Sequence, residues 1–189
     1  CMNDYKYVDL ILGKQCQTKM GRGGIRPLEF KTFSKEMQNA ITNYCQAGGN
    51  FFVSGAYVAS DLWDNRLVKA NEEDKKFAME VLKYKWRVGQ AARNGKVKSV
   101  ASPFPEITGS YTYYQDLNPE SYVVESPDAL EPAAQGAFTI LRYSENNLSA
   151  GIAYKGNYKT CVLGFPFEAI RTVTERELLM KAILTFFEH

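Results

Sequence analysis

Residues 47–60 read Ala-Gly-Gly-Asn-Phe-Phe-Val-Ser-Gly-Ala-Tyr-Val-Ala-Ser, and this stretch indicates the fold class. Its two leading glycines are typical of a helix end. The apolar run 51–53 predicts a short buried strand, and Ser54-Gly55 predicts a sharp turn where that strand ends. In open α/β sheets, ligands bind beyond the carboxyl ends of the strands, and a nucleophile elbow occupies such a turn. We therefore look for a functional site first at this turn.

The segments before this stretch complete a strand–helix–strand unit. The run 5–12 predicts a strand whose apolar end suits a sheet covered on both faces. Ser34 is placed to cap a helix that ends at Ala47, with apolar side chains at the three-and-four spacing. Two strands joined through a helix lie parallel by a right-handed crossover. We therefore predict an α/β fold.

The segment between that first strand and helix, Gly13 to Phe33, is long and basic. It holds four glycines and one acid, Glu29, against Lys14, Lys19, Arg22, Arg26 and Lys31. Loops of this length in compact domains are functional or disordered. Its Gly-Arg-Gly-Gly piece lacks the Gly-Lys-Ser/Thr ending of a phosphate loop, which argues against nucleotide binding. A solvated, mobile loop and an anion-recognising loop around Arg22 and Arg26 both remain open.

After the turn at Ser54, the sequence predicts a β-rich region between two helices. A second helix is expected from Asn71 or Glu72 to about Tyr84. Asn94-Gly95 is a strong signal for a tight hairpin, here between strands 86–93 and 96–101. Further strands are expected at 110–114 and 121–125, and a three-strand meander at 137–143, 148–154 and 160–165.

The last helix has a clear sequence signal at its start. Thr174 is followed three residues later by Glu177, which is the pattern of a capping box. Val173 and Leu178 flank it as a hydrophobic staple. We expect the helix to begin at Thr174 and to bury Leu178 among its apolar residues.

Composition limits the functions that we consider. The chain has 189 residues, 45% of them hydrophobic, which suits one domain over residues 1–189. Its 23 basic and 21 acidic side chains give a net charge of +2, too balanced for a nucleic-acid protein. No apolar run approaches the roughly 20 residues of a membrane span. We expect neither a nucleic-acid partner nor a span.

The four cysteines, at positions 1, 16, 45 and 161, form no Cys-x-x-Cys pair. Metal ligation is therefore not expected, and Cys45 and Cys161 fit inert buried thiols. The only histidine is His189, the last residue given, so no histidine-based triad can be assembled. We expect no catalytic residue, no metal and no cofactor.

The order of these segments resembles a known family. A strand, a helix, the elbow Val-Ser-Gly, later hairpins, then Val-Leu-Gly-Phe-Pro-Phe-Glu and a closing helix are similar to the class I glutamine amidotransferase-like fold. The resemblance implies a flavodoxin-like, mostly parallel sheet with helices on both faces plus antiparallel hairpins. Leu-Ile-Leu-Gly-Lys-Gln and Val-Ser-Gly-Ala-Tyr-Val also resemble domains of large exported bacterial proteins labelled xanthan lyase.

The resemblance also implies where catalytic groups would stand. The family's nucleophilic Cys falls where this chain has Ser54, Gly55 and Ala56, and its His-x-Glu pair falls near the end of the last strand, where this chain has Phe165, Pro166, Phe167 and Glu168. The site is therefore expected to be degenerate. Because a five-stranded parallel sheet needs more strands than three, we further expect an N-terminal strand and helix of the family fold to be missing here.

Polar residues still converge on the expected strand ends. We predict a binding crevice formed by Lys14, Gln15, Ser54, Gly55, Tyr57 and Glu168. The expected function is a non-catalytic amidotransferase-like module of a larger exported, periplasmic or cell-surface protein, which binds an acidic polysaccharide or another anionic ligand. The alternative is a carbohydrate-active lyase or hydrolase that uses Lys, Tyr or Glu without His, including a Ser54–Lys14 pair.

Overall fold

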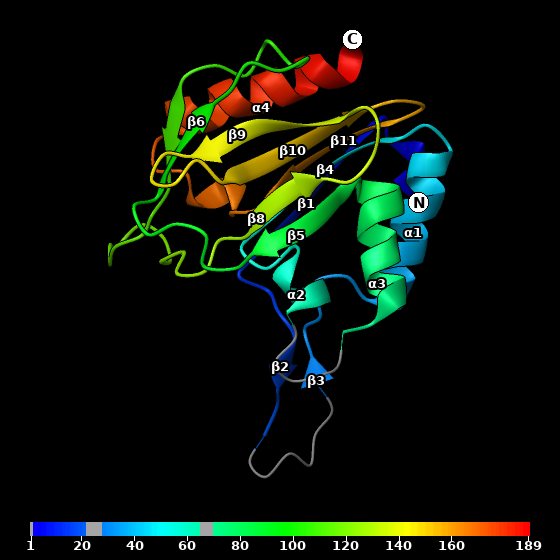
Figure 1. Ribbon diagram of the computed structural model, residues 1–189, viewed down its shortest axis with the longest axis horizontal. Coiled ribbons are helices and arrows are strands. Elements are labelled where there is room, and N and C mark those ends of the chain that lie inside the picture. The colour runs from blue at the N-terminus through cyan, green and yellow to red at the C-terminus, as the bar shows by residue number, and fades with distance from the viewer. Residues whose placement is uncertain (1, 22–27, 65–69) are drawn as a thin grey trace.

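A seven-stranded mixed sheet forms the centre of the computed structural model, which describes residues 2–21, 28–64 and 70–189 (Figure 1). Its strand order is β1-β4-β11-β10-β9-β6-β7. The strands are β1 (Tyr7–Gly13), β4 (Asn50–Gly55), β11 (Lys159–Leu163), β10 (Ser149–Lys155), β9 (Ala137–Tyr143), β6 (Lys96–Ser99) and β7 (Ser110–Thr112). The mixed α/β class is confirmed.

The direction of the strands divides the sheet into two halves. The pairs β1–β4 and β4–β11 are parallel, as the strand–helix–strand unit predicts. The other four pairs, from β11–β10 to β6–β7, are antiparallel. The expectation of a mostly parallel sheet was therefore wrong, because the meander adds its strands by short turns that reverse the chain.

Two small two-stranded sheets accompany the main one. β2 (Thr18–Lys19) and β3 (Leu28–Glu29) pair antiparallel and project away from the body of the molecule (Figure 1). β5 (Tyr84–Val88) pairs antiparallel with β8 (Ala129–Pro132). The side chains of Tyr84 and Leu130 are fully buried in the core on one face of the main sheet.

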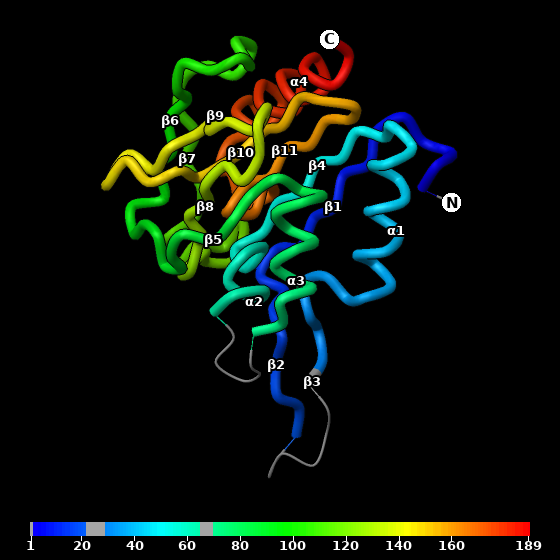
Figure 2. The backbone as a smooth tube through the Cα atoms, turned by 45° about the vertical axis from the view of Figure 1, so that its right-hand side comes forward, coloured from blue at the N-terminus to red at the C-terminus, as the bar shows by residue number. Residues whose placement is uncertain are grey.

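Helices cover both faces of the sheet (Figure 2). α4 (Val173–Glu188) packs on one face, while α1 (Lys35–Gln46), α3 (Glu72–Phe77) and the β5–β8 pair pack on the other. α2 (Ser60–Trp63) is a single turn that follows β4. A π-helical turn, Ala78–Leu82, continues α3, and 3-10 turns span Met2–Asp4 and Phe167–Ala169.

Each face of the sheet has its own core, as the two-residue period of a strand requires. Phe52 points toward α4 and packs in the cluster that contains Ile183 and Phe186. Its neighbour Phe51 points the other way, into the cluster that contains Ile41. The buried run in β4 is thus a strand covered on both sides.

The predicted strand–helix–strand unit is confirmed in its details. The hydroxyl of Ser34 accepts a hydrogen bond from the Met37 amide at 3.3 Å and caps α1. Gly48 has a φ of 90°, and its amide donates to the Cys45 carbonyl at the helix end. β1 then pairs with β4 in register from Tyr7 opposite Asn50.

The predicted hairpin at Asn94-Gly95 does not form. Residues 84–88 pair with β8, whereas β6 lies in the main sheet between β9 and β7. Burial explains the difference, because Tyr84 and Val97 are both fully buried but belong to the cores on opposite faces. The predicted helix to Tyr84 ends at Leu82, where Lys83 turns left-handed, and residues 121–125 form no strand.

The start of α4 also differs from the prediction by two residues. Thr172 is the N-cap, and its hydroxyl accepts from the Glu175 amide at 3.1 Å while the Glu175 carboxylate accepts from the Thr172 amide. The pattern Thr-x-x-Glu occurs at both 172 and 174, and the strand-like contact of Ile170 with Tyr113 fixes the earlier one. The predicted staple is absent, since Val173 and Leu178 are 60% and 58% exposed.

β1 forms one border of the main sheet. Among the described residues, β1 has a strand neighbour on one side only, β4. Ile11, on this border, is 52% exposed. In the described part of the chain, none of the helices has the length and apolar character that a membrane crossing needs.

Candidate functional site

Ser54, the next-to-last residue of β4, has a structural role. Ser54 is fully buried, and its hydroxyl oxygen accepts a hydrogen bond from the Phe167 amide at 3.2 Å. Lys14 instead pairs with Glu125, with 2.6 Å between Nζ and the carboxylate. The structure therefore does not bring Lys14 and Ser54 together as a nucleophile and base.

The next two predicted residues also make local contacts. The Gln15 side-chain amide donates to the Lys31 carbonyl at 2.9 Å, which ties the two ends of the basic segment together. Gly55 is tightly packed, because a Cβ on it would lie 2.9 Å from Cβ of Leu12. The elbow is therefore a packing junction between β1 and β4. Arg22 and Arg26 lie outside the described residues.

Glu168 lies in an acidic corner that the sequence did not reveal. One of its carboxylate oxygens accepts a hydrogen bond from the Tyr122 hydroxyl, and the other is buried without a hydrogen-bond partner. Burial, and then the nearby Glu168 carboxylate, raise the pKa of Asp9 to about 6. Arg171, three residues after Glu168, pairs with Asp116.

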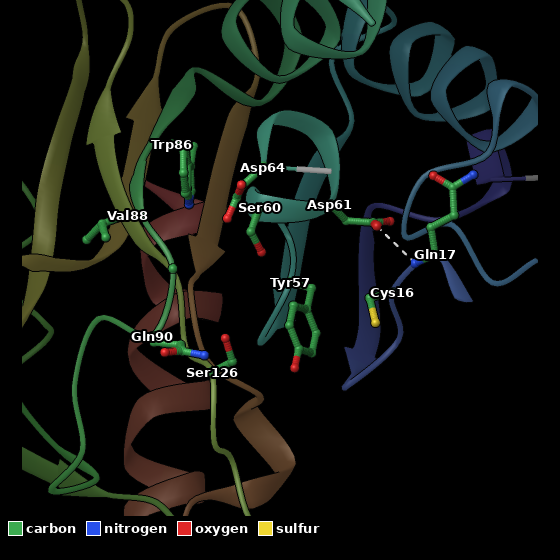
Figure 3. A pocket seen from close by; sticks show the side chains of 11 residues that line it. Cys16, Gln17, Tyr57, Ser60, Asp61, Asp64, Trp86, Val88, Gln90 and Ser126 are labelled. Atoms are coloured by element: carbon green, nitrogen blue, oxygen red, sulfur yellow. Dashed lines mark hydrogen bonds between the residues drawn. The ribbon is translucent and has the colours of Figure 1, made fainter. Parts of the chain in front are cut away.

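A pocket of about 520 Å³ opens beside the predicted crevice, between α2 and β5 (Figure 3). Among the predicted residues that the structure describes, Tyr57 alone lines it. It is lined by Cys16, Gln17, Tyr57, Ser60, Asp61, Asp64, Trp86, Val88, Gly89, Gln90 and Ser126. Most of these residues follow β1 or β4 in the chain, so the pocket does lie at the carboxyl ends of two parallel strands.

The lining of this pocket combines aromatic rings with hydrogen-bonding groups. In the view of Figure 3, Trp86 and Asp61 lie on opposite sides, with Ser60 and Tyr57 between them. Asp61 and Asp64 supply carboxylates, while none of the lining residues that the structure describes is Lys, Arg or His. In its described lining, the pocket thus offers hydroxyls and acceptors beside aromatic surface.

At one wall of the pocket, Asp61 of α2 is hydrogen-bonded to the two ends of the basic segment. One carboxylate oxygen accepts from the Gln17 amide at 2.9 Å (Figure 3). The other accepts from both the amide and the hydroxyl of Thr32, at 2.9 and 3.1 Å. Asp61 therefore holds both ends of the segment 17–32 against α2.

A second carboxylate, Asp128, lies fully buried behind the opposite wall. Its Oδ2 accepts hydrogen bonds from the amides of Ala59 and Ser60, both at 2.8 Å, and from the Ser60 hydroxyl at 3.1 Å. Burial raises the pKa of Asp128 to about 7, against the lowering effect of these donors. This carboxylate thus ties α2 to the segment that precedes β8.

The arrangement favours binding over covalent catalysis. Burial raises the pKa of the Cys16 thiol, so this pocket residue is not poised as a thiolate. Burial also raises the pKa of Cys45 to about 12, as expected of an inert core thiol. Within the described ranges, no three His, Cys, Asp or Glu side chains are grouped so as to hold a metal ion.

Sequence analysis missed most residues of these two sites, among them Trp86, Tyr122 and Asp128. Trp86 was assigned to a hairpin that does not form, and Tyr122 to a strand that does not exist. Asp128 follows Pro127 in a stretch without periodicity. Its signal was weak, because a lone Asp after Pro is typical of a solvated turn.

Comparison with known proteins gives a fold likeness only. No family model matches the chain, and no curated protein matches it. Among solved structures, it is similar to the cold-adapted β-galactosidase from Rahnella sp. R3, with a TM-score of 0.53 and 13% identity. The match covers 82% of this chain and only 21% of that enzyme.

A second solved structure, the mmIFT52 N-terminal domain, is 15% identical with a TM-score of 0.41. That match covers 82% of this chain and 72% of the other. At these identities the likeness to the β-galactosidase concerns the arrangement of helices and strands, and the weaker match adds nothing to it.

Proposed function

We propose that this chain is a non-catalytic carbohydrate-binding module, and that its ligand occupies the pocket between α2 and β5. The observation that carries the proposal is the joint presence of Trp86 and Tyr57 with the hydroxyl of Ser60 in one open pocket. Sugar rings bind by packing their C–H faces on aromatic rings while their hydroxyls exchange hydrogen bonds with polar groups. Both kinds of group line this pocket.

The pocket's charge favours a neutral glycan over an acidic one. Its carboxylates, Asp61 and Asp64, would repel a uronate, and its described lining has no cation to attract one. The earlier expectation of an acidic polysaccharide or another anionic ligand stays a prediction for the basic segment that contains Arg22 and Arg26. The two glycan classes are therefore to be compared directly.

We also propose a wider context for the module. The parallel unit of β1, α1 and β4, with β11 beside it, supports descent from a flavodoxin-like, amidotransferase-like fold whose catalytic positions have been replaced. The match to about a fifth of a β-galactosidase chain supports a role as one part of a larger protein. Export of that protein to the periplasm or cell surface belongs to this proposal.

The alternative is a carbohydrate-active enzyme built on the acidic corner. Its support is the contact of Tyr122 with Glu168, with Lys14 Nζ 5.8 Å from the centre of the Tyr122 ring. A lyase needs a base that takes a proton next to a carboxylate. Burial and the hydrogen bond to Glu168 raise the pKa of Tyr122, which opposes its use as a phenolate base. We therefore favour the binding module.

Calorimetric titration with galactan and polygalacturonate tests the ligand class, because galactan is neutral whereas polygalacturonate carries a carboxylate on each sugar. We expect galactan to bind and polygalacturonate to bind less. Trp86→Ala should weaken galactan binding at least tenfold, since it removes an aromatic wall. Arg87→Ala, on the same strand but outside the pocket lining, is the control and should change binding less than twofold. Equal binding by Trp86→Ala would refute the pocket assignment.

A second assay separates the module from the enzyme. Incubation of the protein with both polymers should release no reducing ends and no unsaturated uronate. If products accumulate and disappear with Tyr122→Phe, the acidic corner is catalytic and the module proposal is wrong.

A further inference from the structure

Asp128 joins three elements behind the pocket, and its backbone is fixed on both sides. Its amide donates to the Gly164 carbonyl at 2.7 Å, and its carbonyl accepts from the Tyr143 hydroxyl at 2.7 Å. Its Oδ2 holds the amides of Ala59 and Ser60 at the start of α2. The main chain of Asp128 therefore cannot shift easily, and any change of charge acts on the carboxyl group alone.

The other oxygen, Oδ1, is buried and has no hydrogen-bond partner. It lies next to the pocket wall, since a Cβ on Gly89 would stand 3.6 Å from it. Nε1 of Trp86 is also buried without a partner, and the indole acts as a nearby donor that lowers the carboxyl pKa. A complementary acceptor and donor thus face the same small space.

The protonation state of Asp128 decides whether these two atoms attract each other. In the carboxylate, Oδ1 accepts and a small turn of the indole pairs it with the Nε1 hydrogen. In the acid, the proton belongs on Oδ1, because Oδ2 already accepts three hydrogen bonds. An O–H would then face an N–H, and one of the two donors would be left without an acceptor.

We infer that Asp128 is the positioning residue of the pocket, and that its carboxylate holds Trp86 and the start of α2 in the geometry that receives a glycan, whereas its acid form releases Trp86. The consequence for binding rests on the proposed function. The movement of Trp86 is independent of the proposed function, so it can be measured without any ligand.

The surroundings of Asp128 support a titration near neutral pH. The ionisable groups that face it are the phenols of Tyr57, Tyr84 and Tyr143, and burial raises the pKa of each from its usual value. They stay protonated between pH 5 and 9. Among the described residues, no Lys, Arg or His contributes to the Asp128 pKa, which burial raises to about 7. Asp128 is thus the member of this group that changes charge.

Tryptophan fluorescence tests the release directly. The chain has two tryptophans, so Trp63→Phe leaves Trp86 as the single reporter. Its emission should change between pH 5 and 9 with a midpoint near pH 7, and Asp128→Asn should abolish the change. An Asn amide presents a donor to Nε1, so that variant should resemble the acid form at every pH. No transition, or one that persists in Asp128→Asn, overturns the inference.

Two control variants exclude other carboxylates as the source of the signal. Asp64→Asn removes an exposed charge from the pocket lining, and Asp9→Asn removes the other carboxyl with a raised pKa. Both should keep the midpoint near pH 7, and loss of the transition in either would contradict the assignment to Asp128. If Asp128→Asn does not fold, as judged by circular dichroism, the pH titration of Trp63→Phe alone still decides whether Trp86 moves.

Galactan binding supplies the ligand test. The affinity should fall about tenfold for each pH unit below 7, because each unit reduces the carboxylate form tenfold. If the fluorescence transition appears and no glycan binds, the proposed function fails and the inference stands. If galactan binds through Trp86 with an affinity that is constant from pH 5 to 9, the proposed function stands and the inference fails.

Discussion

The two halves of the main sheet show how one chain divides structural and binding roles. In the parallel half, the segment after β1 supplies Cys16 to the pocket, and the segment after β4, which includes α2, supplies Tyr57, Ser60 and Asp61. In the antiparallel half, β9, β10 and β11 are joined by short turns that leave little chain for a site. A candidate site is therefore best sought where parallel strands end.

The junction of the two halves should be the position most sensitive to substitution. Gly164 follows β11, and a Cβ on it would lie 2.0 Å from the Asp128 carbonyl oxygen. We expect Gly164→Ala to lower the free energy of unfolding by more than about 4 kcal/mol, because backbone on both sides must move. Urea denaturation measures the loss. Gly89→Ala, whose Cβ would have only ordinary contacts, should stay within about 1 kcal/mol of the parent.

The start of α4, where Glu175 accepts a hydrogen bond from the Thr112 amide at the end of β7, should be less sensitive. Thr172→Ala removes the capping oxygen bonded to the Glu175 amide and should cost about 1 kcal/mol. Thr174→Ala changes a residue inside the first turn and should cost less than about 0.5 kcal/mol. Thermal melts of the two variants compare them directly. A larger loss for Thr174→Ala would mean that the helix begins two residues later.

A smaller effect is expected at the open border of the parallel half. The pKa of Asp9 is raised to about 6 in the folded protein, so the folded state binds this proton more tightly than the unfolded state. Ionisation of Asp9 therefore lowers stability as the pH rises from about 4 to 6. Asp9→Asn should then raise the unfolding free energy at pH 8 and leave it unchanged at pH 3.

We expect this gain to be less than about 1 kcal/mol, because the Asp9 side chain, although partly desolvated by its neighbours, is still exposed at the border and solvent screens its charge. Chemical denaturation at the two pH values gives the difference. A gain that is equal at both would show that the Asp9 carboxyl does not titrate abnormally.

No effect on activity is expected from substitution of Ser54, in the predicted nucleophile elbow. The protein should release no ammonia from glutamine, because Ser54 is buried and its oxygen is engaged by the Phe167 amide. Ser54→Ala should leave this background unchanged. Turnover that Ser54→Ala removes would restore a Ser-based mechanism and give the parallel half a catalytic role.

Sequence reasoning succeeded in the parallel half because its signals are local. One stretch of about 20 residues contains the Ser34 cap, the glycines that end α1 and the apolar run of β4. Each of these signals sets the structure of its own neighbourhood in the chain. The meander at 137–165 was predicted for the same reason, since its turns join neighbouring strands. The hairpin predicted at Asn94-Gly95 was wrong, because Tyr84 and Val97 are buried in the cores on opposite faces of the sheet. The residues around the turn give no sign of that difference.

The candidate site was predictable only in position. The carboxyl ends of β1 and β4 border a pocket, and Tyr57 is one of the residues that line it. Ser54, Gly55 and Gln15 were correctly placed near the strand ends, but packing and backbone contacts use them. Trp86 and Asp128 come from distant segments that only the tertiary fold brings to the pocket, so no spacing in the sequence could identify them.

The hydrogen bonds that Asp61 accepts from Gln17 and Thr32 affect how the sequence of this protein can change in evolution. Because the segment between them is closed at its base, its length alters the rest of the domain little, and doubling such a loop costs only about 0.6 kcal/mol. New recognition sequences could be inserted there without refolding the domain. Replacing Asp61 would end that independence, since the same insertions would then pull on α2 and the pocket wall.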